Sequence, residues 1–492
     1  MDKPDDYESW SKEELVARLR SLDSTTSSSG GAGGSPAATP RKHKRVRRGD
    51  FAFDQFPQRK VAFKFSYFGW PYYGLARQGN VLEPGEKQGI EEKYPTVEGA
   101  LFRALAHCRL ISSEAECDYS RCGRTDRGVS GFGQVVSLYV RSAGKFITDE
   151  EAEAAEKDRA TSGRVTRDAM NDGQAVLLPE DTRELPYVSM LNKILPSEIR
   201  ILAWSPVAAD FDARFSCKSR FYRYFFTEEG LDIGLMKDAA GRLLGTHDFR
   251  NFCRLDPSKQ IKNFERTVLS IEINPVPTRV SFVANAENPA ARWWQLELRG
   301  TAFLWHQVRC MMAILFTVGQ GLEKPGIIDQ MTDVQSMVGK PEYTMASDLP
   351  LVLADCSFDE KDVRWIYVRS GERELGAMAV LDRSILKSWG ELNTRAVMAS
   401  ALLQNLRDTK VPGYGTDGTL EPWASSRVRV TEAERQKTTL MLEGGGETRC
   451  VRRYVPIAQR KRMGPVDERN QAWLERKGRA DKRARVDAGD ST

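Results

Sequence analysis

The chain has 492 residues, of which 40% are hydrophobic and 29% are charged, and its formal net charge is +5. This length suits two domains or one large domain with tails, and the composition is ordinary for a globular protein. The polar, acidic N-terminus predicts no secretory signal, and no apolar run approaches the ~20 residues that a membrane-spanning helix needs. The eight cysteines lack metal-ligand spacing, so we expect reduced thiols rather than a zinc site or disulfides.

Both ends of the chain have the composition of tails. We expect residues 1–57 to hold a short helix near Ser11–Leu19, followed by a Ser/Gly/Ala-rich stretch that is too poor in apolar residues to fold. The basic run Arg41–Arg48 fits a nuclear localisation signal, an RNA-binding arm or merely solvated charge. Residues 412–492 are polar and basic, which predicts a largely disordered tail.

Residues 58–213 alternate between strand and helix patterns. Apolar side chains at every second position from Val61 to Tyr67 indicate a half-buried strand, and Thr96 is placed to cap a helix. Apolar periodicity predicts three further elements: a strand over 134–140, a helix over 187–195 and a strand over 199–204. Residues 144–180 contain an acidic run and few large apolar residues, so we expect an exposed insertion there.

Residues 214–411 form the second half of the expected fold. The predicted elements are strands over 220–226 and 293–299, a helix over 303–318, strands near 351–358 and 363–367, and a last helix over 394–406. This mixed order favours an α+β domain in which helices pack on a largely antiparallel sheet. Strand–helix units recur in both halves, which suggests a duplicated module, although no sequence repeat proves it.

Asp126 is the acid at the centre of the stretch Tyr119–Ser130, which also holds three arginines and two glycines. Glycines indicate tight backbone, and nearby positive charge predicts that the carboxylate stays ionised at low pH. A carboxylate in a cationic cleft suggests nucleophilic or acid–base chemistry on an anionic polymer. A surface loop with solvated salt bridges fits this stretch equally well.

Arg309 lies on the apolar face of the predicted helix over 303–318, four residues after Trp305 and three before Met312. A buried guanidinium needs a carboxylate partner, and Asp126 is a candidate. The long side chain of Arg309 could instead reach the surface.

Tyr222 lies in the predicted strand over 220–226, between Arg220 and Arg223. An aromatic ring in a strand is most often part of a core. Basic residues interleaved with aromatic rings, however, are also how proteins hold unstacked bases. No histidine has metal-ligand spacing, and no nucleotide-binding or metalloprotease motif is present, so neither a cofactor nor a metal is expected.

The segment Gly123–Val129, with the sequence GRTDRGV, resembles the catalytic motif of the TruA-like tRNA pseudouridine synthases. Other blocks resemble this family too: Thr96–Gly99, Leu191–Pro196, Phe211–Ser216, Arg220–Tyr224 and Phe303–Arg309. The segment Gly245–Cys253 favours the eukaryotic branch that modifies uridines 38 and 39 of the tRNA anticodon arm. The resemblance is collinear from about Arg59 to Leu406, and it covers neither the insertion nor the C-terminal tail.

The resemblance implies the pseudouridine synthase fold, in which two similar α+β halves share one mixed, mostly antiparallel sheet and flank a catalytic cleft. Asp126 matches the catalytic aspartate, and Arg124 matches the arginine that helps to displace the target base. Tyr222 matches the tyrosine that stacks on the target uracil. Arg309 matches the arginine that pairs with the aspartate.

The activity implied by the resemblance is the isomerisation of uridine to pseudouridine at positions 38 and 39 of the anticodon stem-loop, without a cofactor. Whether Asp126 attacks C1′, attacks C6 or abstracts a ribose proton stays open. The family also implies tRNA as the partner and a homodimer. We expect a location in nucleus and cytoplasm, and the run Arg41–Arg48 could direct nuclear entry. The alternatives are a related synthase acting on other tRNA or mRNA uridines, a non-catalytic RNA-binding protein, and a structural protein with basic tails.

Overall fold

The computed structural model describes residues 51–77, 94–157, 163–181, 183–277, 292–367, 372–408 and 439–487. These ranges belong to the compact unit Ala52–Thr492, apart from Phe51. The helix predicted near Ser11–Leu19 and the basic run Arg41–Arg48 lie outside the described residues. Within the described ranges, no helix is both long enough and apolar enough to cross a membrane.

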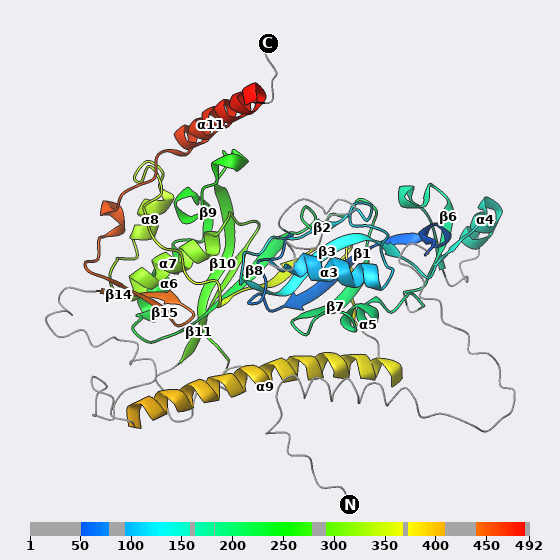
Figure 1. The fold of residues 1–492 in the computed structure, drawn as a ribbon, viewed down its shortest axis with the longest axis horizontal. Coiled ribbons are helices and arrows are strands. Elements are labelled where there is room, and N and C mark those ends of the chain that lie inside the picture. Colours follow the sequence, from blue (N-terminus) through cyan, green and yellow to red (C-terminus); the bar gives the residue numbers. More distant parts are fainter. Residues whose placement is uncertain are drawn as a thin grey trace, which may run out of the picture. The chain divides into compact units, whose positions relative to one another are not determined.

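A ten-stranded sheet organises the fold (Figure 1). Its strands lie in the order β13-β7-β1-β3-β12-β8-β11-β10-β9, and β2 also pairs with β3. In chain order they are β1 (Gln58–Tyr67), β2 (Ser120–Arg121), β3 (Ser130–Arg141), β7 (Ile199–Pro206), β8 (Ser219–Thr227), β9 (Gly245–Asp248), β10 (Glu265–Pro275), β11 (Trp293–Gly300), β12 (Leu351–Ser357) and β13 (Ile366–Tyr367). Every pairing is antiparallel except that of β12 with β3. The predicted α+β class with a largely antiparallel sheet is therefore confirmed.

The parallel contact between β3 and β12 joins the two halves of the chain. It consists of two residue pairs, Val352 with Ser130 and Leu353 with Gly131. A Cβ atom on Gly131 would lie 2.7 Å from the ring of Tyr67 on the neighbouring β1, so a residue without a side chain leaves room for that ring beside the junction. The junction lies directly after the loop that carries Asp126.

Helices α3 (Val97–His107) and α5 (Tyr187–Asn192) contribute to the core of the first half. The hydroxyl oxygen of Thr96 accepts a hydrogen bond of 3.1 Å from the backbone N–H of Gly99, which confirms the predicted N-cap. Apolar side chains of both helices pack with Phe63 and its neighbours on β1. This packing fixes the part of the sheet from which the Asp126 loop emerges.

The second half is built on α6 (Ile233–Gly241), α7 (Gln307–Gly319) and α8 (Ile327–Thr332), with the short 3-10 turns η4 (Arg250–Phe252) and η5 (Pro257–Lys259). All residues of α7 except Ala313 are buried. The helix begins later than the predicted 303 because His306, with a φ of 61°, adopts a left-handed conformation. The sequence did not predict α6, α8, β9 or β10, and α9 (Glu372–Asp408) is much longer than the predicted 394–406.

The insertion at 144–180 is folded, which its acidic composition did not suggest. It contains β4 (Lys145–Phe146), α4 (Asp149–Lys157), β5 (Gly163–Arg167), the 3-10 turn η3 (Ala169–Asn171) and β6 (Ala175–Pro179). The three strands form a separate sheet, and Val176 is fully buried. The side chain of Asn171 bonds to both backbone groups of Gln58, so the insertion is tied to the start of β1.

The C-terminal segment differs from the prediction of a largely disordered tail. Residues 439–487 form the hairpin β14 (Thr439–Gly444) and β15 (Glu447–Val451), the 3-10 turn η7 (Ile457–Gln459) and helix α11 (Val466–Asp487). Met441 and Ile457 are buried, and Ile457 belongs to the core around α7. The prediction of a disordered tail was therefore wrong for residues 439–487. The sequence did not indicate this structure because two isolated apolar residues in a basic stretch give no periodic signal. Residues 412–438 lie outside the described part of the chain.

Candidate active site

A cleft of about 800 Å³ opens where the two halves of the sheet meet. The four residues selected from the sequence, Arg124, Asp126, Tyr222 and Arg309, all line it. The first two come from the loop between β2 and β3, whereas the others come from β8 and α7. The predicted cleft between the two halves is therefore confirmed, and it contains every candidate residue.

The loop that carries Asp126 is held by its neighbours on both sides. The hydroxyl groups of Thr125 and Tyr67 lie 2.8 Å apart, and the backbone N–H of Val129 donates to the carbonyl of Asp126 at 3.2 Å. Gly128 has a φ of +78°, and a Cβ atom there would lie 1.8 Å from Oδ2 of Asp348. The backbone conformation at 128 therefore favours glycine, and a side chain there would also displace the carboxylate of Asp348.

The carboxylate of Asp126 contacts the two residues that precede α7. Nε1 of Trp305 donates a hydrogen bond of 3.2 Å to Oδ1, and Nε2 of His306 lies 3.5 Å from Oδ2. Burial and the nearby charge of Arg309 lower the pKa of His306 to about 4, so the imidazole is neutral at pH 7. The side chain of Asp126 remains 28% exposed, which leaves it accessible to a ligand in the cleft.

Burial raises the pKa of the Asp126 carboxyl above its usual value, and the charge of Arg309 opposes this effect only in part. The expectation that Asp126 stays ionised at unusually low pH is therefore wrong. A carboxylate with a raised pKa is a stronger base and a better nucleophile than an ordinary surface aspartate.

The arginines near Asp126 in sequence are not the main charges that act on its carboxyl, since these come from Arg309 and Arg254. Arg121 pairs with the buried Glu98 at 2.8 Å, and the guanidinium of Arg127 lies 4.3 Å from the ring centroid of Tyr73. Arg124 is exposed at the cleft, where it can meet a ligand. These orientations follow from the tertiary contacts of each side chain and are invisible in the sequence.

Arg309 has partners other than the one predicted. Its side chain is buried, Nε donates to the carbonyl of Ala346 at 2.7 Å, and Nη2 lies 3.2 Å from Oδ1 of Asp348. The described residues include no ion pair between Arg309 and Asp126, so the predicted pairing is corrected to Asp348. The prediction that a buried Arg309 has a carboxylate partner is confirmed. The positive charge of Arg309 still lowers the pKa of Asp126, although the two side chains form no ion pair.

Tyr222 is half-buried in the cleft, and its ring meets that of Phe303 edge to face at a centroid distance of 5.1 Å. Burial raises the pKa of its phenol far above the usual range, so the ring is neutral. The basic neighbours are engaged elsewhere, since Arg220 donates to three backbone carbonyls and Arg223 pairs with Glu297 at 3.0 Å. The aromatic ring of Tyr222 is therefore the feature of β8 that can stack on a base.

Sequence reasoning overlooked Trp305, His306, Asp348 and Arg254 as parts of this site. The guanidinium of Arg254 lies 4.5 Å from the ring centroid of Trp305, and both residues line the cleft. Trp305 and His306 directly precede α7, so the motif 303–309 did contain them. Their contact with Asp126 depends on the left-handed turn at His306, which no local pattern reveals.

Three buried thiols lie behind the Asp126 loop. The sulfur atoms of Cys122, Cys217 and Cys356 all lie within 4.8 Å of one another, among apolar side chains. Among the described residues no fourth cysteine, histidine or carboxylate joins this group, whereas structural zinc sites have four protein ligands. We therefore interpret the three cysteines as core residues that support the loop from behind.

The arrangement suits chemistry on an extruded base. A basic carboxylate, a neutral aromatic ring and an exposed arginine converge in one cleft, and additional cations, Arg254, Lys259 and Arg266, line its wall. A base taken out of its stack needs an aromatic surface to replace the lost stacking, while its backbone needs positive charge. The cleft provides both next to Asp126.

Comparison with known proteins identifies relatives along most of the chain. A family model described as tRNA pseudouridine synthase matches residues 239–359. A protein named tRNA pseudouridine(38/39) synthase from Bos taurus is 37% identical over 458 residues, which cover 91% of this chain and 81% of that protein. Proteins of the same name from Homo sapiens and Saccharomyces cerevisiae are 37% and 40% identical, over 79% and 72% of their lengths.

Proposed function

The chain belongs to the tRNA pseudouridine synthase family, and we propose that it isomerises uridine to pseudouridine at positions 38 and 39 of the tRNA anticodon arm. The main structural support is the placement of Asp126, Arg124 and Tyr222 in one cleft. The names of these relatives support the choice of positions.

The reaction breaks the N1–C1′ bond of uridine and forms a C5–C1′ bond, while the hydrogen on C5 is lost and N1 gains one. No atom or electron is gained overall, so the balance of the reaction requires no cofactor. Asp126 acts as nucleophile or base, and the indole N–H of Trp305 holds its carboxylate by a hydrogen bond. Tyr222 stacks on the extruded uracil, and Arg124 helps to displace it from its stem.

The substitution Asp126→Asn tests this role. We expect it to abolish pseudouridine formation, because an amide is neither a nucleophile nor a base of useful strength, while tRNA binding and the thermal midpoint stay close to wild type. Pseudouridine is measured in tRNA by mass spectrometry, and affinity by filter binding. Full activity in the variant would show that the assigned role of Asp126 is wrong.

The target positions need a separate experiment. Pseudouridine is mapped in all RNA from cells that lack the protein, and in the same cells complemented with wild type or with Asp126→Asn. We expect losses at positions 38 and 39 of tRNA that only wild type restores. Losses confined to other tRNA or mRNA positions would instead support the alternative of a related synthase with different targets.

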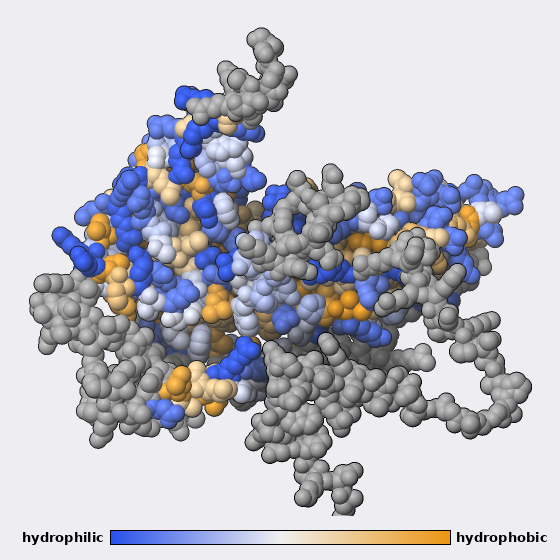
Figure 2. All heavy atoms as spheres, viewed as in Figure 1, coloured by the Kyte–Doolittle hydropathy of each residue, from blue (hydrophilic) through white to orange (hydrophobic). Residues whose placement is uncertain are grey.

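We also propose a homodimer, for which α9 supplies the interface. The helix has 37 residues, and Ile385, Trp389 and Leu392 form an exposed apolar stripe at spacings of four and three residues. Figure 2 shows hydrophobic residues on the described surface of this helix. The same stripe on a second copy of the chain is complementary to it, as in a two-fold interface.

Light scattering after gel filtration tests the dimer and should give twice the monomer mass. The substitution Trp389→Glu should give monomers, whereas Lys387→Glu, at an exposed position on the same helix, should not.

A location in both nucleus and cytoplasm is the last part of this proposal. Its support is the basic run Arg41–Arg48, which fits a nuclear localisation signal. A tagged protein lacking residues 1–57 should lose its nuclear fraction, and unchanged nuclear entry would contradict this role of the run.

A further inference from the structure

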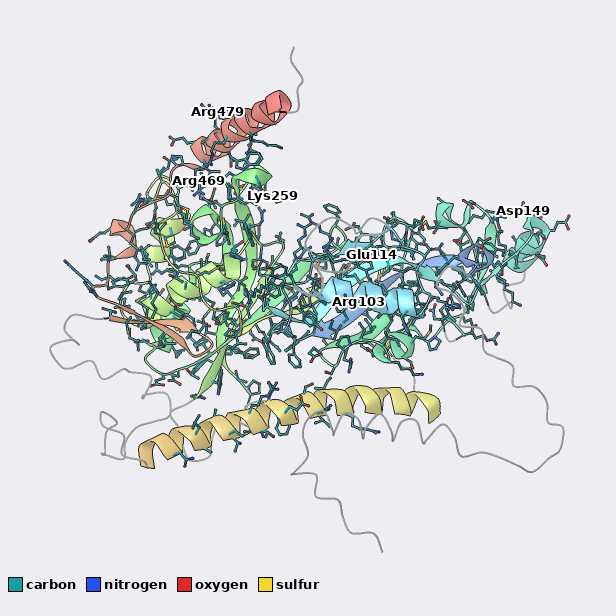
Figure 3. All side chains as sticks on the ribbon, in the orientation of Figure 1. Arg103, Glu114, Asp149, Lys259, Arg469 and Arg479 are labelled. Atoms are coloured by element: carbon teal, nitrogen blue, oxygen red, sulfur yellow. The ribbon has the colours of Figure 1, made fainter. Side chains whose placement is uncertain are left out.

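Helix α11 begins in the wall of the catalytic cleft. Val466, Arg469 and Asn470 line the same cleft as Asp126. Nδ2 of the buried Asn470 donates to the carbonyl of Ile261 at 3.4 Å, and Gln260 donates to the carbonyl of Asn470 at 3.3 Å. These hydrogen bonds fix the first turns of α11 to the segment that follows η5. Figure 3 shows Arg469, at the start of α11, near Lys259.

Beyond Asn470 the helix has little cover from the rest of the protein. Residues 471–480 are exposed, except for the half-buried Trp473. At ~1.5 Å per residue, the helix reaches about 25 Å beyond Asn470 to its end at Asp487. Residues 471–487 contain six basic and three acidic side chains, so this free part carries net positive charge.

Three arginines share one face of α11. Arg469, Arg476 and Arg479 are separated by seven and three residues, which places them in one stripe of an α-helix. Within the described chain, no ion pair engages any of the three: Arg469 contacts the sulfur of Met463, and Arg476 donates to the carbonyl of Ala472. Lys477 lies about 100° around the helix from Arg476, off this stripe.

We propose that the stripe Arg469, Arg476 and Arg479 binds the phosphate backbone of the tRNA as it leaves the catalytic cleft. The inference rests on the proposed function and adds a substrate-binding surface to it. An RNA whose uridine reaches Asp126 must pass the rim of the cleft, where Arg469 is located. This row of guanidinium groups starts at the half-buried Arg469, continues to the exposed Arg476 and Arg479, and has no ion-pair partner among the described residues. It is complementary to consecutive phosphates, and it adds affinity without reading sequence.

The test compares charge reversals on and off the stripe in the full-length protein. Arg476→Glu/Arg479→Glu should weaken tRNA binding about tenfold near 100 mM salt and reduce the slope of log Kd against log salt by about 2. Lys477→Glu is the matched control from the same helix and should change affinity by about twofold or less. The double variant should also raise KM about tenfold, with a much smaller change in kcat. Arg476→Lys/Arg479→Lys keeps the charge and should retain most of the affinity.

Two readouts separate this inference from the proposed function. Wild-type turnover on tRNA tests the function by itself. If wild type forms pseudouridine but the stripe variant binds like the Lys477 control with an unchanged salt slope, α11 is only a solvated helix and the inference is wrong. Circular dichroism and thermal midpoints equal to wild type exclude unfolding as the cause of weaker binding, since the substituted side chains are exposed.

Discussion

Asp126 lies between two opposing influences, burial that favours its neutral form and Arg309 that favours its charged form. The indole N–H of Trp305 adds a hydrogen bond to the carboxylate, whereas the neighbouring imidazole of His306 is neutral. The result is a carboxylate that is oriented by the neutral indole of Trp305 and has no ion-pair partner with a charge at pH 7 among the described residues. Its basicity is therefore available for the reaction.

Replacing Trp305 with phenylalanine tests this arrangement at the scale of one residue. The ring remains, but the hydrogen bond to the charged carboxylate is lost, so the already raised pKa of Asp126 should rise further. The reaction needs the ionised carboxylate of Asp126. As the pH is lowered, a carboxyl with a higher pKa becomes protonated sooner, so activity is lost at a higher pH than in the wild type. We expect the acid limb of the kcat profile to move to higher pH and kcat at pH 7 to fall about fivefold. An unchanged acid limb of the kcat profile would show that Trp305 does not affect the pKa of Asp126.

The loop between β2 and β3 acts as a rigid support and not as a flexible arm. Gly128 lies against Asp348, the partner of Arg309, and Thr125 is tied to Tyr67 on β1. The loop thus links the sheet, α7 and the segment before β12 around one carboxylate. Its shape depends on backbone contacts as much as on side-chain charge.

The pair Gly128→Ala and Gly123→Ala tests the loop as an element. Alanine at 128 would have an unfavourable φ and would push aside the carboxylate of Asp348 that pairs with Arg309, so the free energy of unfolding should fall by about 1–3 kcal/mol and activity should decrease strongly. At position 123 a Cβ atom meets nothing within 4 Å, so stability should be nearly unchanged. Urea unfolding followed by circular dichroism measures both changes. Equal stability of the two variants would contradict the packing argument.

The C-terminal segment is an integral part of the whole molecule. Gln320, at the end of α7, donates to the carbonyl of Leu440 at 2.8 Å, and Ile457 packs into the core around α7. A β-bridge joins Pro341 to Arg462 shortly before α11. The end of the chain therefore covers the helix that supplies Arg309.

Truncation tests this dependence at the scale of the whole molecule. Removing residues 439–492 deletes two buried apolar side chains, Met441 and Ile457, and exposes their contacts on α7. The loss of burial is worth roughly 3–6 kcal/mol, so the thermal midpoint and the soluble yield should fall markedly. Removing only residues 488–492 is the control and should change neither. A fully stable protein ending at 438 would contradict this dependence.

The local patterns of the sequence determined the strands and helices with strong apolar periodicity, the cap at Thr96 and, through the motif around Asp126, the family. These features depend on residues close in sequence, so one sequence reveals them. The partner of Arg309, the direction of the pKa shift at Asp126 and the folding of residues 439–487 depend on groups that are distant in the chain. Burial and ion pairing are set by what packs around a side chain, and only the tertiary structure decides this.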